Sequence, residues 1–145
     1  MNRDELLRFI REHRYAVVST VSASGRPQSA TVGVVVTDQF EVFFDTLAPS
    51  RKSINLQTDP HIAVVFGSLE PGSTKTVQYE GLADQPTGAE LATLLEQYLA
   101  KFHAGLERQD WPGITYFRVR PTWARYSDFS QTPPEICEFD AETFG

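Results

Sequence analysis

The amino-acid sequence predicts a mainly β protein, a β-barrel with flanking helices, built as one domain of residues 1–145. Three observations lead to this fold class. Short runs of β-branched and aromatic residues alternate with turn residues, as in consecutive hairpins. Only one long amphipathic helix interrupts these runs, which argues against repeated β–α–β units. No linker, internal repeat or low-complexity segment divides the chain.

The predicted strands are apolar runs bounded by turn residues. The first two strands form a hairpin across residues 22–27. A loop that holds Pro71, Gly72 and Ser73 precedes the fifth strand, and Pro121 separates the last two. The strands, in chain order, are residues 15–21, 28–36, 40–44, 61–66, 75–83, 114–119 and 123–126.

Two helix starts carry the spacing of a capping box, in which two side chains each bond the other residue's backbone N–H. Asn2 and Glu5 open a helix that ends near His13, and Thr87 and Glu90 open a strongly periodic second helix. The apolar face of this second helix consists of Leu91, Leu94, Leu95, Tyr98, Leu99 and Phe102. The acidic tail after Ser130 is expected to pack loosely or against a partner.

The segment after the third strand combines a helix start with two adjacent cations. Ser50 is a good N-cap, so Arg51 and Lys52 fall in the first turn of a short helix that ends at residues 59–60, Asp-Pro. Free backbone N–H groups lie at that end, and cations there oppose the helix dipole. A bound anion would relieve this conflict. The segment therefore predicts a phosphate cradle, the alternative being two solvated charges on a surface helix.

The composition excludes several classes of protein. Hydrophobic residues make up 41% of the 145 residues and charged ones 22%, as in ordinary globular proteins. The net charge of −6 argues against non-specific binding to nucleic acid or anionic membranes. The single Cys137 excludes an intrachain disulfide and a Cys-rich metal site. With a charged N-terminus and no apolar run of about 20 residues, the chain is expected to be cytoplasmic.

Recognisable catalytic motifs are missing. The sequence has no Gly-x-Gly-x-x-Gly turn, no Walker A loop and no Gly-x-Ser-x-Gly elbow. His13, His61 and His103 lie in different predicted elements without metal-ligand spacing, so no metal site is predicted. No acid, base or nucleophile stands out, and no catalytic residue is assigned. This pattern is expected where an organic cofactor carries the chemistry.

The order of these features resembles the pyridoxamine 5'-phosphate oxidase-like family of FMN-binding split β-barrels. The likeness extends over nearly the whole chain and rests on an ordered set of short motifs. These motifs are residues 16–21, 24–27, 42–46, 50–52, 59–60, 63–66 and 120–123, together with Leu56 and Gly81. The resemblance implies a split β-barrel and a homodimer with FMN in a cleft between the two protomers.

The resemblance also implies a set of cofactor-binding residues. Residues 50–52 would bind the FMN phosphate, residues 44–46 would lie beside the ribityl chain, and residues 30–34 would pass the flavin ring. Gly33 would allow close approach of that ring, and the partner protomer would contribute Thr76 and the region of Trp123. The implied residues are Ala30, Thr31, Val32, Gly33, Val34, Phe44, Asp45, Thr46, Ser50, Arg51, Lys52, Thr76 and Trp123.

The chain departs from the oxidase itself at several positions. Ala30 and Val35 stand where that enzyme has Arg and Lys, and residues 124–129 lack its Arg-rich substrate signature. We therefore expect an FMN-dependent oxidoreductase that acts on an unassigned small molecule other than vitamin B6. Two alternatives stay open: a reductase of the same fold that uses the deazaflavin F420, and a non-catalytic flavin- or haem-binding protein.

Homodimer formation is also predicted from the residues. The helix of residues 91–102 and the aromatic strand end of residues 123–129 carry more apolar surface than one small barrel readily covers. An isologous two-fold contact would bury this surface and create two equivalent sites. The cofactor would then lie at the interface, with its ring shielded on two sides.

Overall fold

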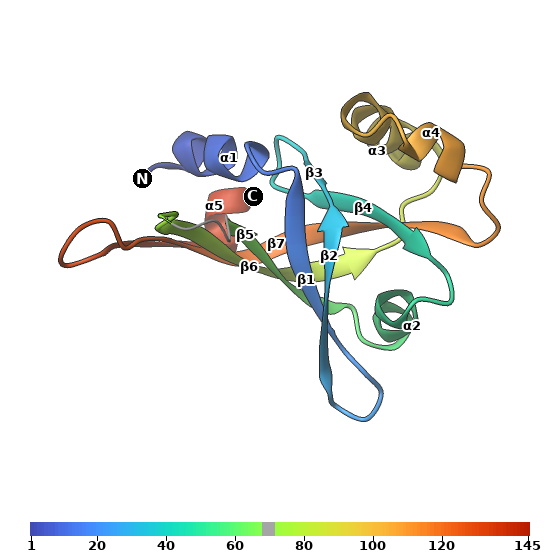
Figure 1. Ribbon diagram of the computed structural model, residues 1–145, viewed down its shortest axis with the longest axis horizontal. Coiled ribbons are helices and arrows are strands. Elements are labelled where there is room, and N and C mark those ends of the chain that lie inside the picture. Colours follow the sequence, from blue (N-terminus) through green and yellow to red (C-terminus); the bar gives the residue numbers. More distant parts are fainter. Residues whose placement is uncertain (68–71) are drawn as a thin grey trace.

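The computed structural model describes residues 1–67 and 72–145, so Pro71 of the predicted loop lies outside the described residues. It confirms the mainly β fold with flanking helices (Figure 1). The strands are β1 (Tyr15–Val21), β2 (Pro27–Gly33), β3 (Val35–Val36), β4 (Val42–Leu47), β5 (His61–Gly67), β6 (Lys75–Asp84), β7 (Ile114–Asp128) and β8 (Glu135–Asp140). The helices are α1 (Arg3–Arg11), α2 (Arg51–Thr58), α3 (Gly88–Lys101), α4 (Gly105–Arg108) and α5 (Ala141–Phe144).

All the strands belong to one antiparallel sheet in the order β2–β1–β5–β6–β7–β4–β3, and β8 pairs with β7. Side chains alternate between the two faces of each strand, and the inner face holds the core. Phe44, Phe66 and Tyr79 are among its largest buried members. Helices α1 and α5 close this core with Ile10 and Phe144.

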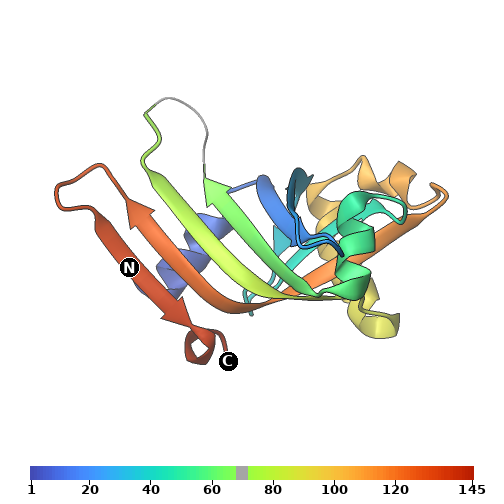
Figure 2. The ribbon, with the colours of Figure 1, turned by 90° about the horizontal axis from the view of Figure 1, so that it is seen from below.

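The outer face of the sheet is covered unevenly. Helix α3 packs on β3 and β4. Its residues Leu94 and Tyr98 form a second buried cluster with Phe43 and with Phe102, the residue that follows the helix. Figure 2 shows α1 behind the sheet and no helix in front of the middle of β5 and β6; α2 lies in front only at one end of the sheet. Val65 of β5, whose side chain is 44% exposed, lies on this open face.

All three predicted helices begin where the sequence indicated, and the predicted capping interactions are confirmed at two of the three starts. Asn2 and Glu5 form the capping box of α1, with N–H to side-chain distances of 2.7 and 2.9 Å. Ser50 caps α2. The predicted box at α3 is wrong, because Thr87 makes no side-chain cap bond and Glu90 accepts from Arg118 at 3.1 Å instead. No helix in the described part of the chain is both long and apolar enough to cross a membrane.

Three differences from the predicted strands have a clear physical reason or change the connectivity. Pro121 does not divide β7, because it pairs with Gly81 at a register shift where the ladder is already irregular. A side chain at Gly81 would overlap the backbone carbonyl of Arg120. The second predicted strand breaks at Val34, and the third begins at Val42 because Phe40 takes a turn conformation with φ of 61°.

The acidic tail is ordered on the barrel, which corrects the expectation of loose packing. Residues 135–140 form β8 and pair with residues 123–128 of β7. Phe139 and Phe144 are both buried in the main core. The tail therefore completes the protein's own core.

Candidate functional site

A pocket of about 490 Å³ lies where β2, the carboxyl end of β4, the start of α2 and the α3–α4 segment meet. We call it the β2–α2 pocket. The structure brings seven of the predicted site residues together there, from three separate segments of the chain. They are Thr31, Val32, Gly33, Asp45, Thr46, Ser50 and Lys52.

The other predicted residues lie elsewhere. Arg51 is exposed on the first turn of α2, beside Lys52, but does not line the pocket. Val34 and Phe44 are fully buried in the core, and Ala30 pairs with the core residue Val18. Thr76 and Trp123 lie on β6 and β7, away from this pocket. Their predicted role therefore depends on a second protomer.

The start of α2 has the donors that an anion requires. The Ser50 hydroxyl accepts from the Ser53 N–H at 3.3 Å and bonds the Thr46 hydroxyl at 2.9 Å. The first N–H groups of a helix have no intrahelical acceptor, so those of Arg51 and Lys52 are available to a ligand. No carboxylate of the described residues lies within ion-pair distance of Arg51 or Lys52. This end of the pocket is cationic and uncompensated.

Helix α2 is fixed to the sheet by a buried amide. Asn55 is 5% exposed, and its Nδ2 donates to Thr20 Oγ1 and to Gln28 Oε1, both at 2.9 Å. Leu56 of the same helix enters the main core. The cradle is therefore held on β1 and β2 before any ligand arrives.

Asp45, the carboxylate of the pocket, is paired. Arg108 Nε donates to Asp45 Oδ2 at 2.8 Å, and Arg108 Nη2 donates to the Tyr98 hydroxyl at 3.2 Å. The hydrogen bond to Asp45 is the main cause that raises the pKa of Arg108. Burial, followed by the Asp45 charge, raises the pKa of Tyr98 to about 12, so this phenol stays protonated. The pair reduces the repulsion that Asp45 would exert on an anionic ligand.

Gly33 faces an aromatic side chain of the chain itself. A Cβ at Gly33 would lie 2.7 Å from two ring carbons of Phe102, so only glycine fits there without displacement. Phe102 is 6% exposed and stacks on Tyr98 with ring centroids 5.0 Å apart. A flavin ring and Phe102 cannot both lie directly on Gly33. Close approach of the flavin ring at Gly33 stays a prediction, and it requires Phe102 to move.

Nine residues that line the pocket were not predicted for it from the sequence, among them Arg14, Phe102, Arg108 and Trp111. Arg14 looks like a solvated charge after a helix, and Phe102 belongs to a regular apolar helix face. Arg108 and Trp111 follow α3 in a segment without strong periodicity. The pairing of Arg108 with Asp45 spans 63 residues, and no local sequence signal could have indicated it.

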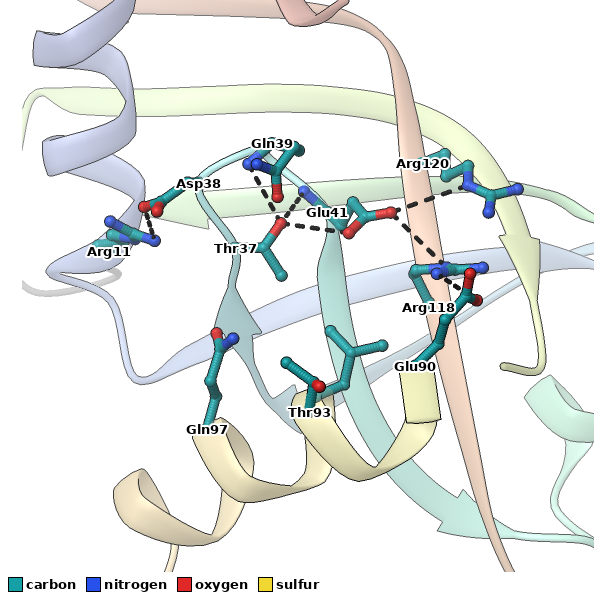
Figure 3. Close-up of a pocket in the computed structure, with 11 residues that line it drawn as sticks. Arg11, Thr37, Asp38, Gln39, Glu41, Glu90, Thr93, Gln97, Arg118 and Arg120 are labelled. Atoms are coloured by element: carbon teal, nitrogen blue, oxygen red, sulfur yellow. Dashed lines mark hydrogen bonds and ion pairs between the residues drawn. The ribbon is translucent and has the colours of Figure 1, made fainter. Parts of the chain in front are cut away.

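A second pocket, of about 560 Å³, lies between the β3–β4 turn, the start of α3 and β7 (Figure 3). We call it the Arg118 pocket. Arg118 is 6% exposed and donates to Asp84 at 2.7 and 3.0 Å and to Glu90 at 3.1 Å. Arg11 and Arg120 are also paired with carboxylates. The cations of the Arg118 pocket are therefore neutralised by carboxylates, so the smaller β2–α2 pocket is the better anion site.

The family model described as pyridoxamine 5'-phosphate oxidase matches residues 3–128 of the chain. No curated protein matches the chain by sequence.

Several solved structures share the fold at low sequence identity. A haem-binding protein from Mycobacterium smegmatis is 18% identical, with a TM-score of 0.85 over 99% of this chain, which spans 60% of that protein. HutZ, the haem storage protein from Vibrio cholerae, is 18% identical, with a TM-score of 0.72 over 83% of this chain and 91% of its own. A pyridoxamine 5'-phosphate oxidase-related, FMN-binding protein from Nostoc punctiforme is 16% identical, with a TM-score of 0.65 over 94% of this chain and 87% of its own. At these identities the likeness shows the split-barrel fold alone.

Proposed function

Since the chain belongs to the pyridoxamine 5'-phosphate oxidase family, we propose that it is an FMN-binding flavoprotein that acts as an FMN-dependent oxidoreductase. The observation that carries the proposal is the cationic, uncompensated start of α2 inside a pocket that β2 also lines. The pocket volume, about 490 Å³, falls in the range of small-molecule sites.

The proposed phosphate site uses two kinds of donor. The free N–H groups at the start of α2 lie beside Ser50 and Lys52, which line the pocket, and Lys52 adds a positive charge. Charge-assisted hydrogen bonds of this type are about twice as strong as neutral ones. The Ser50 and Thr46 hydroxyls are hydrogen-bonded to each other, and Ser50 also caps the first turn of α2. Little reorganisation is therefore needed when a phosphate binds.

The proposed ring site lies along β2, at the edge of the sheet. An edge strand leaves backbone N–H and C=O groups unpaired, and these can bond the polar edge of a flavin. Trp111 lines the same pocket and would limit the access of water to the ring, whereas Phe102 has to move if the ring lies on Gly33. FMN, when bound, supplies the redox chemistry, and the protein binds it, orients it and limits solvent access.

Haem is the second candidate, because two of the similar structures are named for haem binding or storage. The donor set favours FMN, since the described residues that line the β2–α2 pocket include no His, Cys or Met to ligate iron. Titration of the apoprotein with FMN, F420 and haemin tests the proposal. We expect FMN to bind tightest and to displace the others; a protein that binds haemin or F420 but not FMN would contradict it.

We also propose that the protein is a homodimer, through a surface that keeps the predicted strand end at Trp123 but not the predicted helix of residues 91–102. The apolar face of α3 is packed against the chain's own strands, so it is not available for a partner. On the outer face, no helix of the described chain lies over the middle of β5 and β6 or over residues 123–128 of β7 (Figure 2). Thr31, Val17 and Val65 are register neighbours in one row on this face. The row continues from the β2–α2 pocket, so a second copy docked here would border the cofactor.

Thr76 and Trp123 fit this arrangement. Residues 77 and 79 of β6 are buried in the core, so Thr76 projects to the other face. Trp123 pairs with the exposed Glu80 on that same face. In the proposed dimer both residues belong to the interface, where they can reach the partner's FMN.

The Val65→Glu substitution should dissociate the dimer, because it buries a carboxylate without a partner. We expect the dimer dissociation constant, measured by sedimentation or light scattering, to rise by at least about tenfold. Leu106→Glu places the same charge on an exposed leucine of α4 and should leave the dimer intact. A wild-type protein that stays monomeric and still holds FMN would refute the dimer alone.

A further inference from the structure

Arg14 stands at the junction of α1 and β1 and lines the β2–α2 pocket. Its carbonyl accepts from the Val34 N–H at 3.1 Å, and the next residue, Tyr15, pairs with Gly33. Arg14 therefore lies at the carboxyl end of β2. The cradle of Ser50 and Lys52 follows the carboxyl end of β4. Figure 1 shows that β3 continues β2 and that α2 follows the other end of β4, and β3 pairs with β4 in antiparallel orientation. The carboxyl ends of β2 and β4 therefore point in opposite directions, so the two cationic groups lie at opposite ends of the pocket.

The guanidinium of Arg14 is held over an aromatic ring. Its Cζ lies 4.4 Å from the centroid of Phe102 and 6.0 Å from that of Tyr15. In a guanidinium that stacks on a ring, the N–H groups point outward in the plane of the guanidinium and are not used by the ring. Two of them can then donate to the two oxygens of a carboxylate. The aromatic surface beneath it is buried, since Phe102 is 6% exposed. The arrangement orients the donors before a ligand binds.

The charge at this end of the pocket has no acidic partner. Within the described residues, no carboxylate lies in ion-pair distance of Arg14, in contrast to Arg108, which Asp45 neutralises. The nearby Lys101 adds a second cation, and its Nζ donates to the carbonyls of Val34 at 2.8 Å and His13 at 3.0 Å. Burial and then the Arg14 charge lower the pKa of Lys101, as expected where positive charge is not compensated. This local potential is positive in a chain of net charge −6.

We propose that Arg14 is a specificity-determining residue that binds the carboxylate of a planar organic acid, the second ligand of the β2–α2 pocket. The planar shape follows from the aromatic side chains nearby, Tyr15, Tyr98, Phe102 and Trp111. The proposal rests on the proposed function in that FMN, with its phosphate at the α2 end, leaves the Arg14 end to the substrate. The FMN phosphate then binds at the start of α2, and the carboxylate of the substrate binds at Arg14.

The test compares benzoate with benzamide, which has nearly the same shape and no charge. Affinities are measured by calorimetry on the FMN-loaded protein in a buffer of low ionic strength. We expect benzoate to bind at least tenfold more tightly than benzamide, and Arg14→Met to bring this ratio close to one. Arg14→Lys keeps the charge without the flat fork and should retain a reduced preference. Arg8→Met removes an exposed charge from α1 and should leave the ratio unchanged.

A wild-type ratio near one, or a ratio that Arg14→Met leaves unchanged, overturns the proposal. Circular dichroism of each variant shows whether it has folded, and the Lys variant supplies a second reading if the Met variant has not. The FMN titration is separate, and the benzoate ratio is measured on the FMN-free protein as well. If the protein does not bind FMN but still prefers benzoate to benzamide through Arg14, the cofactor assignment is refuted and the role of Arg14 stands.

Discussion

Lys52→Met is expected to weaken FMN binding by roughly 10- to 150-fold, which corresponds to the loss of about 1.5–3 kcal/mol for a hydrogen bond to a charged group. Lys52 lines the pocket at the start of α2 and has no carboxylate partner among the described residues. Its charge is therefore free to act on a phosphate. The measurement is the FMN dissociation constant from flavin fluorescence or absorbance.

The control for this prediction is Arg8→Met, which removes one exposed positive charge from α1. It separates a direct contact from a general change in the charge of the protein, and it should alter FMN affinity by less than about twofold. Arg51→Ala should have a smaller effect than Lys52→Met, because Arg51 is exposed and does not line the pocket. Equal affinities in the wild type and the Lys52 variant would contradict the phosphate site.

Arg118→Met should destabilise the fold by about 3 kcal/mol, the lower end of the range for breaking a buried ion pair. Arg118 is 6% exposed and joins Asp84, Glu90 and Glu41, which come from β6, the start of α3 and the β3–β4 turn. Its removal leaves three carboxylates close together. We choose the lower end because Glu90 and Asp84 remain partly exposed to water. Urea unfolding measures the change, which should also lower the Tm by roughly 6–12 °C.

Glu90→Gln is the matched control for Arg118→Met. Its side chain is 64% exposed, so the loss of this one ion pair should cost less than about 1 kcal/mol. If Arg118→Met lowers the free energy of unfolding no more than Glu90→Gln does, Arg118 makes only a surface ion pair and the prediction is contradicted.

Local signals were enough to predict several elements of the fold. The Asn2 and Glu5 capping box and the Ser50 N-cap involve residues three apart, and the structure has both. The capping box at α3 failed because a distant partner competed: Arg118, 28 residues away, takes the Glu90 carboxylate. Pro121 did not end a strand because Gly81, 40 residues earlier, faces it at a bulge. Contacts between distant segments decided both outcomes.

In the candidate site, too, local sequence signals predicted one part, and contacts between distant segments decide the other. The sequence pattern of residues 45–52 pointed to the polar end of the pocket, because a strand end, a turn and an N-cap are adjacent in the chain. The opposite end depends on Arg14 and Phe102, which are 88 residues apart and meet only in the folded chain. Phe102 looked like one more apolar position of a helix that faces a partner. Its contact with Gly33 depends on how α3 packs on the sheet, which periodicity does not specify.

Comparison of FMN with riboflavin tests the central claim most directly, because the two differ only in the phosphate. If the start of α2 binds that phosphate, the wild-type protein should bind FMN at least about 100-fold more tightly than riboflavin, as expected for two or more charge-assisted hydrogen bonds. In the double variant Arg51→Ala, Lys52→Met this preference should fall at least about tenfold, because only the backbone N–H donors remain, while riboflavin affinity stays nearly unchanged. Equal wild-type affinities for the two flavins, or an equal loss of both in the double variant, would contradict the account.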